Sequence, residues 1–269
     1  MPQLSAIVIT RNEAGNIGEC LDSLAFCDER IVVDCGSTDA TVEIARGRGA
    51  RVEVHEWRGF GPQKSHALAL ATGIWVLSID ADERVDARLL EQLGALDLSE
   101  TRRAYAVDRR NLLLGKHVRR AGWGNNWLVR IYHRGVCRFS DARVHEKVVV
   151  PHSVSLVRLE GGLWHDAICD IDQFLEKVSF YSELCRGPSS KLRSIPHILL
   201  GAGWAFFRSY VLRLGFLEGW RGLLIAHFDA QGSFVKHFKR YVDARTQASA
   251  ASRPATWGAR AKSSMIDRR

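Results

Sequence analysis

Three carboxylates stand within four positions where the apolar run of VLSIDADERV, residues 76–85, comes to an end. They are Asp80, Asp82 and Glu83. Like charges this close repel one another and resist removal from water, so a buried strand that ends on them needs a cation nearby. Mg²⁺ and Mn²⁺ take carboxylate oxygens together with the phosphate oxygens of a substrate. Because alternate residues of a strand point the same way, Asp80 and Asp82 can face one crevice.

An acidic helix start is the alternative interpretation of these carboxylates, since the helix dipole favours negative charge there. That interpretation suits Glu83 and Asp86, which would then be solvated. It does not suit Asp80, which closes an apolar strand. We therefore expect a divalent metal and a diphosphate at Asp80 and Asp82.

The elements that position these residues alternate between strands and helices over the first hundred positions. The pattern predicts strands at 4–10, 30–36, 51–56 and 74–80, and helices at 14–26, 37–49, 62–73 and 87–96. Such alternation is typical of an α/β fold with an open, mostly parallel sheet and helices on both faces. Ligands of such sheets bind beyond the carboxyl ends of the strands. Polar segments at 10–12, 34–36 and 80–82 follow strands, so we expect them to converge on one edge.

Charge is divided unevenly along the 269 residues. Residues 1–98 carry 9 Lys or Arg against 16 Asp or Glu, a net of −7, and residues 99–269 carry 29 against 14, a net of +15. The sum is the overall +8. The basic half suggests a surface that faces a membrane or another polyanion. The six cysteines form no CxxC pair, and the N-terminus has no secretion signal, so we expect a reducing compartment.

The segment 195–228 combines apolar, aromatic and arginine residues. Its longest stretch without a charged residue runs from Ile195 to Phe207, 13 residues. A helix that spans a bilayer needs about 20 residues. Arg208, Arg213 and Arg221, set among aromatic side chains, suit an amphipathic helix in a membrane interface. The alternative is a helical hairpin packed against the core or against a second copy.

Several motifs resemble a known family. AIVITRNEAGNIGECLDSL, IVVDCGSTDATVEIA and WVLSIDADE are similar to the nucleotide-sugar-binding half of the family 2 inverting glycosyltransferases, which have the GT-A fold. EWRGFGPQKSHALALATG and RIYHRGVCRFSDARVHEKV resemble a narrower group. That group includes lipopolysaccharide inner-core β-1,4-glucosyltransferases, which act on heptose at the cytoplasmic face of the inner membrane.

The resemblance implies an open mixed sheet and a set of donor and metal residues. The set comprises Thr10, Arg11, Asn12, Glu13, Asp34, Lys64, Asp80, Asp82 and His165. The first four would line a uridine pocket, and Asp34 would accept a hydrogen bond from uracil. Lys64 would lie near the diphosphate, Asp80 would hold the ribose or a metal-bound water, and Asp82 would ligate Mg²⁺ or Mn²⁺. His165 would be a further metal ligand or a phosphate contact, or else a structural histidine at a strand end.

Inversion also requires a general base for the acceptor hydroxyl. Glu146 in VHEKV and Asp141 in FSDAR are the candidates, and Glu146 is favoured by its match to a VHE motif. A lone acid in a basic stretch can equally be a salt-bridge partner. Residues 1–98 would form the nucleotide-sugar-binding half, 99–187 the acceptor half, 188–245 an amphipathic membrane-interface segment, and 246–269 a disordered tail.

The leading hypothesis is a metal-dependent enzyme that transfers a hexose, with glucose expected, from a UDP-sugar to heptose of a membrane glycolipid. It would be peripheral on the inner face of the cytoplasmic membrane. A haloacid-dehalogenase-like phosphatase is an alternative because its nucleophile also lies in a DxD at a strand end. A non-catalytic basic module that binds membranes or nucleic acid is the other, although no nucleic-acid motif accompanies the charge.

Overall fold

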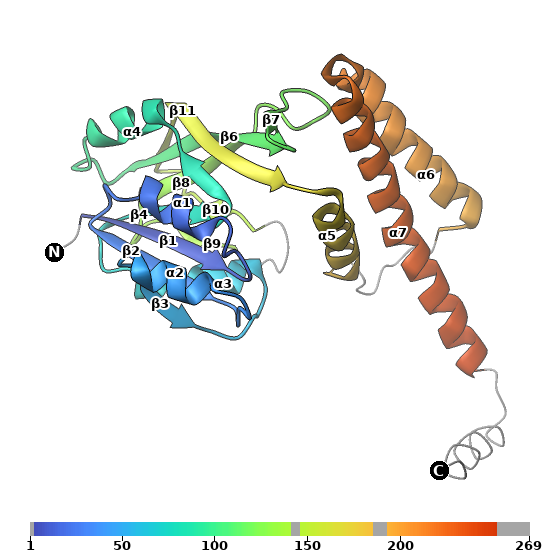
Figure 1. The fold of residues 1–269 in the computed structure, drawn as a ribbon, viewed down its shortest axis with the longest axis horizontal. Helices are drawn as coiled ribbons and strands as arrows, with labels where there is room; N and C mark the ends of the chain where they lie inside the picture. Colours follow the sequence, from blue (N-terminus) through green and yellow to red (C-terminus); the bar gives the residue numbers. More distant parts are fainter. Residues whose placement is uncertain (1–2, 141–145, 185–192, 252–269) are drawn as a thin grey trace, which may run out of the picture. The chain divides into compact units, whose positions relative to one another are not determined.

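The computed structural model describes residues 3–140, 146–184 and 193–251, and the chain divides into two compact units (Figure 1). The first unit is Met1–Gln173 and the second is Phe174–Arg269. The residues that the sequence analysis assigned to a site all belong to the first unit. Among them, Asp141 lies outside the described residues.

One nine-stranded mixed sheet forms the first unit, in the order β3-β2-β1-β4-β8-β6-β11-β5, with β7 beside β6. The strands are β1 Leu4–Thr10, β2 Glu29–Asp34, β3 Arg51–Val54, β4 Trp75–Asp80, β5 Glu83–Val85, β6 Arg103–Leu113, β7 Lys116–His117, β8 Trp127–His133 and β11 Ser155–Ile168. The first four in this order are parallel, whereas β8 is antiparallel to both β4 and β6. Strands β9 Arg138–Phe139 and β10 Val148–Val149 form a separate two-stranded sheet, and Phe139 packs into the core beside Tyr132. The prediction of an open α/β sheet is confirmed.

Helices cover both faces of this sheet. They are α1 Ile17–Ser23, α2 Thr41–Gly47, α3 Phe60–Leu70 and α4 Ala87–Gly94. Residues of α1, α2 and α4 share one buried cluster with β1 and β4, and α3 shares a second cluster with the opposite side of those strands. The predicted strands are confirmed to within two residues, and each helix is shorter than predicted.

Asp86 lies at a helix start as predicted, but its side chain is only 11% exposed and pairs with Arg110, and Glu83 does not lie at a helix start. Asp86 is the N-cap of α4, where its side chain accepts a hydrogen bond from the Leu89 backbone N–H. The prediction that Glu83 lies at a solvated helix start is wrong. Glu83 belongs to strand β5 and is fully buried, because β5 pairs with β11 at the edge of the sheet. A carboxylate with no exposed surface requires partners inside the protein.

The second unit is helical. Helix α5, Ile171–Leu184, leads into it, and α6 Ile195–Phe207 and α7 Trp220–Ala251 form a packed hairpin (Figure 1). A π-helical turn, η1 Arg208–Leu212, and a 3₁₀ turn, η2 Gly215–Glu218, connect the two. Within the described ranges, no helix has the combination of length and apolar character that crossing a membrane requires. Helix α7 continues into the segment predicted as a tail, whose residues 252–269 lie outside the described part.

Candidate active site

The predicted polar residues meet at the carboxyl ends of the parallel strands. Strand register places Thr10 opposite Asp34 across β1 and β2, and Ile9 opposite Asp80 across β1 and β4. The neighbouring strands β1, β2 and β4 therefore end at the same edge. The expectation that these segments converge is confirmed. The reason is geometric, because parallel neighbours in register must end together.

Asp34 organises the loops at this edge. Its Oδ2 accepts hydrogen bonds from the backbone N–H groups of Gly36 and Ser37, at 2.9 and 2.8 Å, and Oδ1 accepts one from the Ser37 hydroxyl. Ser37 Oγ in turn accepts from the Asn12 N–H at 2.8 Å. Asn12 takes a left-handed backbone conformation, φ 54°, which asparagine tolerates better than most residues. These bonds hold the loop after β1 against the loop after β2.

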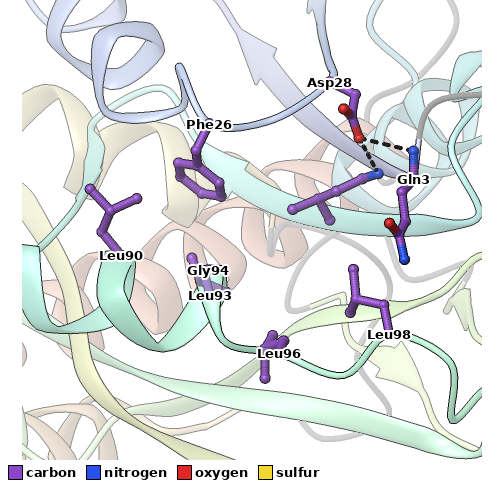
Figure 2. A pocket seen from close by; sticks show the side chains of 9 residues that line it. Gln3, Phe26, Asp28, Leu90, Leu93, Gly94, Leu96 and Leu98 are labelled. Carbon is purple, nitrogen blue, oxygen red and sulfur yellow. Dashed lines mark hydrogen bonds between the residues drawn. The ribbon is translucent and has the colours of Figure 1, made fainter.

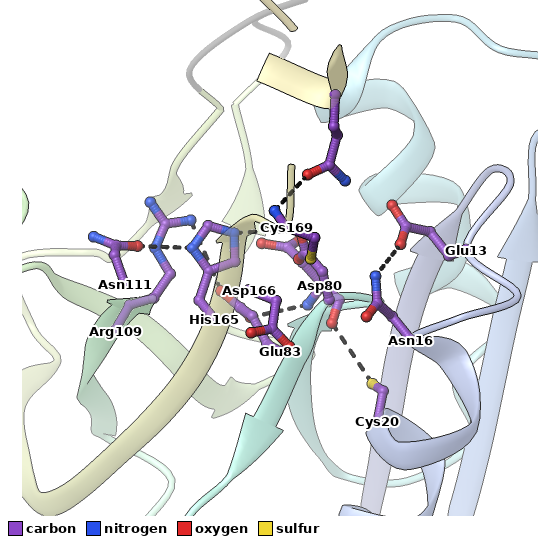
Figure 3. Close-up of polar contacts among 12 residues, drawn as sticks. Glu13, Asn16, Cys20, Asp80, Glu83, Arg109, Asn111, His165, Asp166 and Cys169 are labelled. Atoms are coloured by element: carbon purple, nitrogen blue, oxygen red, sulfur yellow. Dashed lines mark hydrogen bonds and ion pairs between the residues drawn. The ribbon is translucent and has the colours of Figure 1, made fainter. Parts of the chain in front are cut away.

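Two more of the predicted donor residues belong to these loops. Glu13 donates its backbone N–H to Thr41 Oγ1 and accepts from Asn16 Nδ2 at 2.7 Å (Figure 3). Arg11 is exposed next to them. Thr10 Oγ1 is buried and has no hydrogen-bond partner in the described part of the chain. A buried hydroxyl without a partner is costly, so a bound polar ligand at this point would satisfy it.

Asp80 lies between two buried cations. Lys64 Nζ from α3 is 2.8 Å from Asp80 Oδ1, and Arg130 Nη2 from β8 donates to Asp80 Oδ2 at 2.8 Å. Burial alone raises the pKa of Asp80, but Arg130 and Lys64 lower it by more, so that pKa stands well below its ordinary value. The carboxylate is ionised, and each of its oxygens already faces a cation.

Glu83 shares Arg130 with Asp80. Arg130 Nη2 contacts Glu83 Oε1, Arg109 Nη1 lies 3.8 Å from the same oxygen, and Glu83 Oε2 accepts from the Asp80 N–H at 3.0 Å. Burial raises the pKa of Glu83, and Arg130 opposes that rise without cancelling it. Through these contacts, Glu83 holds the Arg130 guanidinium beside Asp80.

Glu146 reaches the same network from the other half of the unit. Its Oε1 lies 2.7 Å from Lys64 Nζ, so one ammonium bridges Asp80 and Glu146. Burial and the nearby Arg130 lower the pKa of Lys64, but Asp80 and Glu146 together raise it by more, so the net direction is upward. The sequence analysis allowed for Glu146 as a salt-bridge partner, and this contact is present. It brings the residue to the donor edge of the sheet.

His165 and Asp82 form a second pair at this edge. His165 Nε2 lies 3.3 Å from Asp82 Oδ2, and its Nδ1 lies 2.7 Å from Asn111 Oδ1 (Figure 3). Asn111 Nδ2 donates to the Trp123 carbonyl at 2.8 Å, which leaves Oδ1 as the acceptor toward His165. Nδ1 therefore carries the proton. In the neutral ring, the Nε2 lone pair then faces a carboxylate oxygen.

Two acceptors that face each other require a proton or a cation between them. A carboxylate and an imidazole whose other nitrogen is held by a hydrogen bond form a usual pair of metal ligands. The described residues contain no group of three or more His, Cys, Asp or Glu side chains that could hold a metal. A cation at Asp82 and His165 would thus take its other ligands from a substrate and water.

A separate pocket lies at the opposite end of β1 (Figure 2). It measures about 260 Å³, and its lining is mainly apolar, with Phe26, Leu90, Leu93, Leu96 and Leu98. Its carboxylate, Asp28, already accepts from the Gln3 and Leu4 N–H groups, and those bonds lower its pKa. This pocket has no convergent reactive groups, which gather instead at the carboxyl edge.

Comparison with known proteins agrees with this arrangement. The model of the family "Glycosyl transferase family 2" matches residues 5–112. The lipopolysaccharide core biosynthesis glycosyltransferase LpsC of Rhizobium meliloti is 31% identical over 253 residues, which cover 87% of this chain and 93% of that protein. The chain belongs to glycosyl transferase family 2. This membership sets aside the phosphatase and the non-catalytic module considered above.

Other relatives of this family 2 glycosyltransferase have less specific names. An uncharacterized glycosyltransferase of Rickettsia felis is 30% identical over 250 residues, covering 88% of each chain. The solved structure of S. aureus TarS is 17% identical, with a TM-score of 0.45, and the match covers 89% of this chain and 54% of TarS. That structure is too distant to assign ligands here.

Sequence analysis missed two residues of this glycosyltransferase site, Arg130 and Asn111. Arg130 lies in the motif RIYHRG, and the signal for its role is a charged residue in the middle of the apolar strand β8, where it is buried. Asn111 lies in an arginine-rich strand and carries no local sign of its contact with His165. Both act on residues about 50 positions away in the sequence.

Proposed function

We propose that this glycosyltransferase transfers a hexose, with inversion, from a UDP-sugar to a membrane glycolipid, using Mg²⁺ or Mn²⁺. The observation that supports the metal is the Asp82–His165 pair, in which Asn111 directs the histidine lone pair toward the carboxylate. A divalent cation held there would neutralise charge on the departing diphosphate. These two residues would hold it, and Asp80 would stay outside its first coordination sphere.

The nucleotide would occupy the loops after β1 and β2. Thr10 offers its unpartnered hydroxyl, and Asp34 retains acceptor capacity beside the three hydrogen bonds that it already accepts. Asp80 would accept from the ribose hydroxyls. Its two cations keep it ionised, which makes it a strong acceptor. Lys64 would act through Asp80 and Glu146 rather than at the diphosphate.

Glu146 would be the general base. In the transfer step, the acceptor oxygen forms a bond to the anomeric carbon while the bond from that carbon to the diphosphate oxygen breaks. The proton of the acceptor hydroxyl passes to Glu146, and UDP leaves with the bonding electron pair. Because Lys64 contacts Oε1 of Glu146, the proton would go to Oε2. Asp141 remains the competing candidate.

The acceptor is proposed from the named relative. LpsC is described as a lipopolysaccharide core biosynthesis glycosyltransferase. That supports a lipopolysaccharide core acceptor, with heptose of the inner core as the expected residue and glucose as the expected sugar. Such an acceptor would place the enzyme on the cytoplasmic face of the inner membrane.

The direct test is UDP release by the full-length protein from several UDP-sugars, with a lipopolysaccharide-core lipid acceptor and with Mg²⁺, Mn²⁺ or EDTA. UDP release that needs both the metal and the acceptor supports the proposal. Asp82→Ala should abolish transfer and weaken metal-dependent UDP binding. Unchanged turnover and metal dependence in Asp82→Ala would rule out the assigned metal site.

The base is tested by a matched pair of variants. Glu146→Gln keeps the side-chain size but cannot take a proton, so it should lower the rate of the chemical step by roughly 10²–10⁴-fold. UDP-sugar binding should remain nearly unchanged. Asp141→Asn is the control and should lower the rate of transfer much less. A larger loss of transfer rate in Asp141→Asn than in Glu146→Gln would show that Asp141 is the base.

A further inference from the structure

The outer face of α6 in the helical hairpin is apolar and exposed. Its large side chains that stand in solvent are Ile195, Leu199, Leu200, Trp204 and Phe207, with Leu200 73% and Trp204 56% exposed. Residues three or four positions apart lie on one side of a helix, and the pairs 195/199, 200/204 and 204/207 have that spacing. The inner side of α6 is different, because Ile198 and Ala205 are buried. Thus α6 has one face packed in the hairpin and a second apolar face with no described partner.

The turns after α6 and the start of α7 also carry exposed apolar side chains. Leu212, Phe216, Leu217, Trp220 and Leu223 are each 45–56% exposed. The α7 residues that face the hairpin, Ile225, Ala226 and Phe228, are buried. We call the exposed set from Ile195 to Leu223 the apolar face. So many exposed large apolar side chains within one short segment are unusual for a protein that meets only water.

Arginines border the apolar face. Arg208 and Arg213 are exposed in the turns, and Arg221 lies over the Trp220 ring, with its guanidinium carbon 4.3 Å from the ring centroid. From 195 to 223 there is one acidic residue, Glu218, against these three arginines, and Asp229 of α7 is the acidic residue near Arg208 and Arg213. Tryptophan and arginine side chains favour the boundary between lipid tails and head groups, where the ring or stem is buried and the polar end stays hydrated.

We propose that the apolar face inserts into the head-group region of an anionic lipid bilayer, with α6 lying along the surface. This extends the proposed function, because it specifies how the enzyme meets a lipid-linked acceptor. A 13-residue helix is about 20 Å long, which suits a helix in the interface better than one across a bilayer about 30 Å thick. The three arginines would contact lipid phosphates.

A second copy of the chain is the competing occupant of this surface. A symmetric contact pairs the same patch on both subunits. Because the arginines border the patch, such a dimer would bring like charges together, whereas an anionic bilayer brings opposite charge to them. The charge of the surface therefore favours lipid.

The experiment is co-sedimentation of purified full-length protein with phosphatidylcholine vesicles, with and without phosphatidylglycerol, at low salt. We expect binding to the anionic vesicles and much weaker binding to the neutral ones. The variant Leu200→Glu/Trp204→Glu should bind the anionic vesicles at least about tenfold more weakly. Arg208→Gln/Arg213→Gln should lose roughly fivefold per arginine on anionic vesicles. Leu90→Glu, at an exposed leucine of α4 in the first unit, is the matched control and should bind as wild type.

Absence of wild-type binding to anionic vesicles overturns the proposal. Unchanged binding of Leu200→Glu/Trp204→Glu does so as well. Light scattering of the same samples tests the competing occupant. A dimer that Leu200→Glu/Trp204→Glu dissociates, with no vesicle binding, would assign the apolar face to self-association. Circular dichroism checks that each variant is folded. The vesicle assay contains neither donor nor acceptor, so its result is independent of the UDP-release assay.

Discussion

Replacing Arg130 by methionine tests whether the buried charge network holds the site together. Methionine retains most of the aliphatic stem but removes the guanidinium from Asp80 and Glu83. Asp80 would keep Lys64 at 2.8 Å. Glu83, with no exposed surface, would keep one arginine, the more distant Arg109 at 3.8 Å. The perturbation thus leaves one buried carboxylate poorly compensated.

The expected cost follows from that geometry. Removing one partner of a buried ion pair costs about 3–5 kcal/mol, because the other charge stays buried. Because Arg109 remains, we expect Arg130→Met to lower the free energy of unfolding by about 3 kcal/mol, the lower end of this range. Arg109→Met is the matched control. Its charge is 3.8 Å from Glu83 and its side chain is 26% exposed, so its loss should cost no more than about 1 kcal/mol.

Hydrogen exchange of the full-length protein measures the effect where it arises. Amides of β4 and β8 should exchange roughly a hundredfold faster in Arg130→Met, since 1.36 kcal/mol corresponds to a factor of ten. Peptides from α6 and α7 provide an internal reference. Adding Glu83→Gln removes the poorly compensated charge and should recover at least half of the loss. An effect below about fivefold, or a double variant no better than the single one, refutes the reasoning.

Three further predictions concern the site and the thiols. Asn111→Leu removes the acceptor of the His165 Nδ1 proton, so the affinity for Mn²⁺ in the presence of UDP should fall about 10–100-fold. Calorimetry measures this affinity, and an unchanged value would contradict the tautomer assignment. Asp34→Ala should raise the KM for the UDP-sugar more than it lowers kcat, because the nucleotide loops are remote from the bond that breaks; a loss confined to kcat is the opposing result. Burial raises the pKa of Cys27 to about 12, so at pH 8 only about one molecule in 10⁴ carries the thiolate. Iodoacetamide mapping should label the exposed Cys169 first and Cys27 only after unfolding, and equal rates would contradict this.

The donor edge could be predicted from the sequence because its determinants are local. Apolar runs such as 4–10 and 74–80 form strands through their own composition, and parallel strands place the residues that follow them together. The position of Asp80 at the carboxyl edge of the sheet could therefore be predicted without knowledge of the strand order. The 13-residue apolar run of α6 could also be predicted from the sequence, because the helix ends at Phe207, directly before the charged residue Arg208.

The partners of these residues depended on the tertiary structure. Arg130 meets Asp80 because β8 pairs antiparallel with β4, and His165 meets Asn111 because β11 pairs in register with β6. A shift of one residue in a strand's register turns every side chain to the other face, and no local pattern specifies which distant strand is the neighbour. Glu83 illustrates the consequence. In the local sequence, Glu83 belongs to an acidic segment. Only the pairing of β5 with β11 buries it. The buried carboxylate is stabilised by the guanidinium of Arg130, which comes from strand β8.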